Sequence, residues 1–197
     1  MTSRVAILVC LVVVAGLAGD PAFAHTGGSL SGGLLGGFTH PLFGPDHIAA
    51  MVAVGLWGAF LGPPAIWLLP IVFPLVMAVG GVIGILGIPL PDVERAIAGS
   101  AIVLGLTVAL ALRAPLWFAA ALVGFFAIFH GYAHGAELPP GANAVAFSLG
   151  FVVATGLLHL AGIAFGLLTR WRLGAIAVRA LGGVIAVAGA VFLLNAS

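Results

Sequence analysis

The most constraining feature of the sequence is a row of long apolar stretches separated by short segments rich in glycine, proline and arginine. A helix needs about 20 mostly apolar residues to cross the hydrocarbon core of a bilayer, and Gly- and Pro-rich segments mark the turns between such helices. Six stretches meet this requirement: 28–61, 65–88, 93–112, 115–137, 143–169 and 174–195. We therefore predict an all-α fold, a polytopic membrane helix bundle of six transmembrane helices.

The composition supports a membrane protein and excludes other classes. Of the 197 residues, 63% are hydrophobic and 6% are charged, whereas a soluble domain carries about 25% charged residues. The formal net charge is +1 and every basic residue other than histidine is an arginine. Because so few basic residues cannot form the patch that a phosphate backbone requires, the expected partner is the lipid bilayer and not a nucleic acid.

Glycines recur at four-residue spacing in the apolar stretches, at Gly80/Gly84, Gly131/Gly135 and Gly162/Gly166 among other pairs. Small residues at this spacing let membrane helices approach closely. The pattern predicts tight packing within the bundle, and it leaves open a homo-oligomer that associates through glycine-rich helix faces.

The N-terminal region, residues 1–24, has the pattern of a cleaved signal peptide. Arg4 precedes an apolar run of about 13 residues, too short for a bilayer crossing, and Ala22-Phe23-Ala24 matches the small-residue cleavage motif. Cleavage would leave a single transmembrane domain, 25–197, beginning at His25 outside the cytoplasm. The arginines concentrate at the ends of the predicted helices on the side of the membrane away from His25. The positive-inside rule therefore also predicts that both mature termini lie outside the cytoplasm.

The first predicted span contains the motif His40-Pro-Leu-Phe-Gly-Pro-Asp46-His47. Two prolines and a glycine within eight residues disrupt a helix, so we expect the first helix to be broken here. Pro45 suits the first position of a new half-helix, which would place Asp46 in its first turn, where a carboxylate interacts favourably with the helix dipole. Ionisable residues inside a bilayer are costly and mark functional sites. His40, Asp46 and His47 are therefore candidate metal ligands.

The fourth and fifth spans carry the other intramembrane histidines. His130, His134 and Glu137 are four and three residues apart, which places them on one face of a helix. Two imidazoles at this spacing can bind one metal ion from the same side, and His130 and His134 complete the candidate metal site. Glu137, His159 and the predicted N-terminal His25 are candidates for additional ligands or for groups at the entrance.

Imidazole nitrogens combined with one or two carboxylates suit Ni²⁺, Co²⁺, Zn²⁺ or Cu²⁺. The single cysteine, Cys10, falls in the predicted signal peptide, which argues against a Cu⁺ pathway built on soft sulfur ligands. Since the candidate ligands other than His25 lie in predicted membrane helices, where ionisable groups normally mark a substrate path, the bound ion is expected to be a substrate, and no permanently bound cofactor is expected.

Three motifs resemble those of the HupE/UreJ family of nickel/cobalt permeases. They are the first-helix motif continued to Trp57, the segment from Phe129 to Glu137, and the segment from Gly150 to Gly162 that contains Thr155 and His159. The resemblance covers most of the mature chain in order. It implies a permease, not an enzyme, that imports Ni²⁺ or Co²⁺ across the bacterial inner membrane, with Zn²⁺ and Cu²⁺ less expected.

Two alternatives remain at the level of the sequence. One is a membrane metalloenzyme, a hydrolase or oxygenase with a histidine-rich metal centre in which Asp46 would be the general base. The other is a metal-binding accessory subunit of a larger transporter. The sequence has one His-x-x-x-His pair and no nucleotide-binding motif, and both observations favour the permease.

Overall fold

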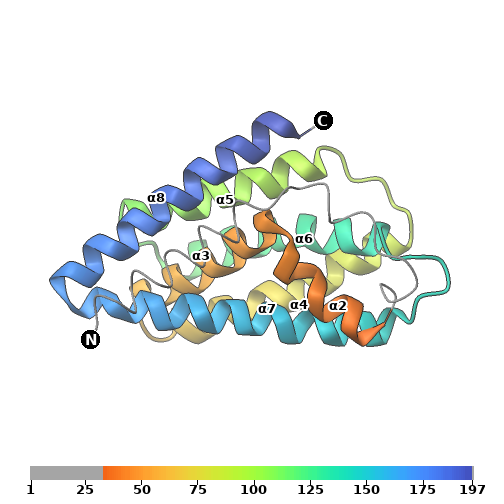
Figure 1. Cartoon of the computed structure of the whole chain (residues 1–197), viewed down its shortest axis with the longest axis horizontal. Coiled ribbons are helices and arrows are strands. Elements are labelled where there is room, and N and C mark those ends of the chain that lie inside the picture. The colour runs from red at the N-terminus through yellow and green to blue at the C-terminus, as the bar shows by residue number, and fades with distance from the viewer. Residues whose placement is uncertain (1–32, 197) are drawn as a thin grey trace.

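The computed structural model describes residues 33–196, and these fold into seven α-helices and one short 3₁₀ turn. The predicted signal peptide and His25 lie outside the described residues, so both stay predictions. The helices are α2 (Leu34–Phe43), α3 (Pro45–Leu61), α4 (Ala65–Ile85), α5 (Val93–Ala109), α6 (Leu116–Ala136), α7 (Ala144–Gly166) and α8 (Arg172–Asn195). Figure 1 shows them running back and forth along the length of the molecule.

The helical class of the fold is confirmed, while the number of spans is confirmed only in part. Four helices of the described region are long and apolar enough to cross a bilayer, and the bent pair α2–α3 makes a fifth if it forms one span. Helix α5 has only 17 residues, at the lower limit for a crossing. The sixth span therefore stays a prediction.

Helix α3 forms the centre of the bundle, since every residue from Ala49 to Gly58 is buried. The other helices surround it, with α7 beside both α2 and α3, α4 packed against α6, and α5 packed against α8 (Figure 1). The outer faces of these helices carry large exposed apolar side chains such as Leu75, Leu149 and Val187. An apolar exterior around a buried central helix is the arrangement expected in lipid.

The predicted break in the first helix is confirmed. Gly44 has a non-helical backbone and separates α2 from α3, whose axes differ in direction by 83°. Pro45 begins α3 and Asp46 lies in its first turn, because proline at this position loses no helical hydrogen bond. This bend brings His40 and His47, from two different helices, toward the same end of the bundle.

The predicted close packing at the spaced glycines is confirmed for α4 and α6. A Cβ atom at Gly131 or Gly135 would collide with the backbone carbonyls of Met77 or Gly81, and one at Gly80 with that of Ile128. The two helices can therefore touch backbone to backbone only because these positions carry no side chain. Homo-oligomerisation through other glycine faces stays a prediction.

This contact yields a first prediction, since α6 carries two of the histidines. Gly131→Ala should destabilise the protein by about 1–3 kcal/mol, because the added methyl group overpacks a rigid backbone contact. The thermal midpoint of the detergent-solubilised protein measures the effect. Gly156→Ala is the matched control, because a Cβ there meets nothing within 4 Å. Equal midpoints for the two variants would contradict the role of Gly131.

Candidate metal site

Three histidines from three helices converge near one end of the bundle. His40 comes from α2, His47 from the first turn of α3, and His134 from the last turn of α6. One ring nitrogen of each lies within 4.8 Å of those of the other two. We call these residues the three-histidine cluster. His47 and His134 are buried, and His40 is half-buried.

The ring nitrogens are close to the spacing that a shared metal ion requires. The Nε2 atoms of His47 and His134 are 2.7 Å apart. Nitrogens bound to one ion through bonds of about 2.0–2.1 Å lie at most about 4.2 Å from each other, so small side-chain rotations would bring all three imidazoles onto a divalent cation. The cluster can therefore supply three neutral nitrogen ligands, a donor set that suits borderline transition metals.

Asp46 contacts the cluster through His47. Its Oδ1 atom accepts hydrogen bonds from the Nδ1 atom of His47 at 2.8 Å and from the backbone N–H of the same residue at 2.9 Å. Since a carboxylate only accepts hydrogen bonds, Nδ1 of His47 carries the proton and Nε2 presents a lone pair. This carboxylate–histidine arrangement orients metal-binding imidazoles in many proteins. The structure thus places Asp46 behind His47, a candidate ligand, where the carboxylate still brings negative charge to the site.

Gly44 makes room for this pair at the break between α2 and α3. A Cβ atom at Gly44 would lie 2.7 Å from Nδ1 of His47 and 3.2 Å from Oδ1 of Asp46. The glycine of the motif therefore serves both the bend and the contact between the carboxylate and the imidazole.

His130 precedes His134 by one turn of α6, and its ring contacts His47 of the cluster. Its ring centroid is 5.5 Å from that of His47. Its Nδ1 atom donates to the carbonyl of Phe126 at 3.0 Å, so its Nε2 atom has the lone pair. That Nε2 atom is buried and has no hydrogen-bond partner within residues 33–196. His130 therefore borders the cluster but is not one of its three members.

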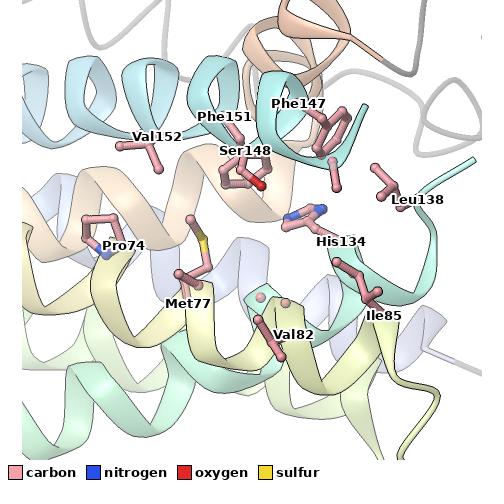
Figure 2. Close-up of a pocket in the computed structure, with 15 residues that line it drawn as sticks. Pro74, Met77, Val82, Ile85, His134, Leu138, Phe147, Ser148, Phe151 and Val152 are labelled. Carbon is pink, nitrogen blue, oxygen red and sulfur yellow. The ribbon is translucent and has the colours of Figure 1, made fainter. Parts of the chain in front are cut away.

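Two cavities meet at His134. One, of about 250 Å³, contains the cluster residues and opens past Glu94, Glu137 and Asn195; we call it the mouth. The other, of about 200 Å³, lies between α4 and α7 and is lined mostly by apolar side chains. Figure 2 shows the ring of His134 between Met77 and Ile85 of α4 and Phe147 and Phe151 of α7. His134 thus lines both the mouth and an apolar groove that is open between α4 and α7.

The sequence-based candidates separate into distinct positions. His40, His47 and His134 form the cluster, Asp46 and His130 contact it through His47, and Glu137 lines the mouth. His159 lies apart, against Phe73 in the core. Sequence reasoning missed Glu94, which lines the mouth from α5. In the sequence, Glu94 lies between Asp92 and Arg95 and looks like one of several charged residues near a turn. No spacing to the histidines marked it as part of a site.

Comparisons with known proteins extend over most of the chain. The profile of a protein family described as HupE / UreJ protein matches residues 11–192. A curated relative, Protein HupE of Rhizobium leguminosarum bv. viciae, is 47% identical over 176 residues, which cover 89% of this chain and 92% of the relative. No solved structure matches the chain significantly.

Proposed function

Because the chain belongs to the HupE/UreJ family, we propose that it is a secondary permease that imports Ni²⁺ or Co²⁺ across the bacterial inner membrane. The observation that carries this proposal is the three-histidine cluster, in which imidazoles from three helices, two of them buried, converge inside an apolar bundle. Intramembrane ionisable groups are costly and usually lie on a substrate path. A site of three neutral ligands is also open enough to release what it binds.

In the proposed mechanism, the cation enters through the mouth and exchanges water ligands for imidazoles. His47 presents Nε2 because Asp46 holds its Nδ1–H, and the neighbouring Nε2 atom of His134 then carries the proton that joins the two rings. A cation that binds both Nε2 atoms requires His134 in its other neutral tautomer, with the proton moved from Nε2 to Nδ1, since metal ions bind deprotonated imidazole nitrogen. Asp46 offsets the cation's charge and the positive end of the α3 dipole.

We further propose that the mouth faces the outside of the cytoplasm. The mouth is lined by the beginning of α5, the residue after α6 and the end of α8, and the predicted positive-inside arrangement assigns these ends to the outer side. Both mature termini would then also lie outside the cytoplasm.

Metal accumulation in cells that express this chain alone tests the proposed function. Cells producing it should accumulate Ni²⁺ or Co²⁺ above vector controls, and His47→Ala should remove the difference. Accumulation only in the presence of a further subunit would favour the accessory-protein alternative. Equal accumulation in cells with and without the chain would contradict the permease.

The mouth yields a second prediction. Glu94 and Glu137 are exposed at its rim, where carboxylates attract cations. Glu94→Gln should raise the metal concentration for half-maximal uptake by up to about fivefold, because exposed charge interactions contribute about 0.2–1 kcal/mol. The difference should shrink at high salt, which screens exposed charges. An unchanged concentration dependence at low salt would show that Glu94 plays no part in capture.

A further inference from the structure

A second group of buried polar atoms lies deeper in the bundle than the three-histidine cluster. Both ring nitrogens of His159, the hydroxyl of Thr155 and Nε2 of His130 are buried, and none has a hydrogen-bond partner among the described residues. Burying polar atoms without partners is unfavourable, and each such group in a folded protein calls for an explanation, an unseen ion or water among them.

Thr155 departs from the behaviour of three other buried or half-buried hydroxyl groups among the described residues. Ser100, Thr107 and Thr169 each donate to a carbonyl three residues earlier. This bond is the usual way to satisfy a hydroxyl in an apolar helix. Thr155 is fully buried and makes no such bond within the described part of the chain. Since it precedes His159 by four residues, both side chains project from the same face of α7.

The two groups of histidines are linked by Phe73 of α4. Its ring contacts His130 on one side and His159 on another, with centroids 5.4 Å and 5.5 Å apart. His130 in turn contacts His47. The contacts between rings therefore run without interruption from the cluster through His130 and Phe73 to His159.

The depth of His159 fits a position along a route through the bundle. The cluster meets α7 at Phe151, whose ring centroid is 4.3 Å from that of His134. His159 follows eight residues later, which corresponds to about 12 Å along a helix at 1.5 Å per residue. Seven further residues, about 10 Å, lead to the end of α7 at Gly166. His159 thus lies between the cluster and the inner end of the bundle.

We propose that His159 and Thr155 form a second, inner binding site for the transported cation, separated from the three-histidine cluster by Phe73. This inference rests on the proposed function for the identity of its cation, a borderline divalent metal ion, which suits imidazole nitrogen. One imidazole and one hydroxyl bind more weakly than three imidazoles, so the ion keeps several water ligands there. A weaker inner site would release its ion more readily than the tighter outer site.

A Co²⁺ titration of the purified full chain in detergent, followed by the visible absorption of the bound ion, tests the inner site. The parent should show two binding steps. His159→Phe, which preserves an aromatic contact with Phe73, should abolish the weaker step and leave the tighter step within twofold. His47→Ala should remove the tighter step. A single step in the parent, or a weaker step that persists in His159→Phe, would overturn the proposal.

Thr155→Val provides a second variant of nearly the same volume, in case His159→Phe does not fold. It should weaken the second step at least threefold and leave the thermal midpoint unchanged, and an unchanged second step would overturn the role of Thr155. Co²⁺ flux in proteoliposomes separates this inference from the proposed function. A parent that shows both steps and carries no Co²⁺ contradicts transport alone, whereas a parent that carries Co²⁺ with one binding step contradicts the inner site alone.

Discussion

Asp46→Asn is expected to reduce metal uptake by a factor of about 10–100, the range that loss of a partner behind a metal-binding histidine typically produces. The asparagine keeps the shape of the side chain, and its amide oxygen can still accept from Nδ1 of His47. The substitution removes the negative charge, however. In the parent, this charge strengthens the hydrogen bond to His47 and offsets both the charge of the cation and the positive end of the α3 dipole. Initial rates of Ni²⁺ and Co²⁺ uptake at limiting metal measure the effect.

Asp92→Asn is the matched control for this prediction. Asp92 forms an ion pair with Arg95 at 3.0 Å, and both side chains are largely exposed, so its charge should contribute little. The Asp92 variant should transport like the parent. If Asp46→Asn, inserted in the membrane at parental levels, also transported like the parent, the proposed role of the carboxylate would be wrong.

His134→Phe is expected to have an even larger effect, because it removes a ligand and not a partner behind one. Phenylalanine preserves the aromatic contacts of position 134 with His40, at a centroid distance of 4.7 Å, and with Phe151, at 4.3 Å. The loss of affinity should exceed the about 10–100-fold typical of outer-shell changes. Isothermal titration of the purified protein with Ni²⁺ measures it directly.

Tyr132→Phe controls for a polar-to-apolar change in the same helical turn. Tyr132 is not a member of the three-histidine cluster, so its phenylalanine variant should bind Ni²⁺ like the parent. Parental affinity in the His134 variant, with a parental thermal midpoint, would exclude His134 as a ligand.

The break in the first helix was predictable from the sequence because its cause is local. Two prolines and Gly44 within one short motif leave the chain few ways to continue a helix, and Pro45 begins α3 as expected. Helix bounds were also close to the predicted ranges, since Gly- and Pro-rich turns end helices wherever they occur. Helix α5 was predicted at 93–112 but ends at Ala109, and a residue with positive φ, Ala111, follows it.

The division of roles among the candidate ligands could not be predicted in the same way. Whether Asp46 points at an ion or at its neighbour His47 depends on the side-chain geometry created by an 83° bend. The membership of His40 in the cluster in place of His130 depends on how α2 packs against α7, and the position of Glu94 at the mouth depends on how α5 packs against α6. Helical spacing placed His130 and His134 on one face of α6. Which of these two histidines joins His40 and His47 depends on the position of the α2–α3 bend along α6.

X-ray absorption spectroscopy of the Ni²⁺-loaded, purified chain tests the central claim most directly, because it counts the ligands of the bound ion. We expect three imidazole nitrogens in the parent and two in His134→Phe loaded at saturating Ni²⁺, with oxygen from water completing the coordination. A parent spectrum without imidazole ligands, or one that His134→Phe leaves unchanged, would contradict the assignment of the three-histidine cluster as the site of the transported metal.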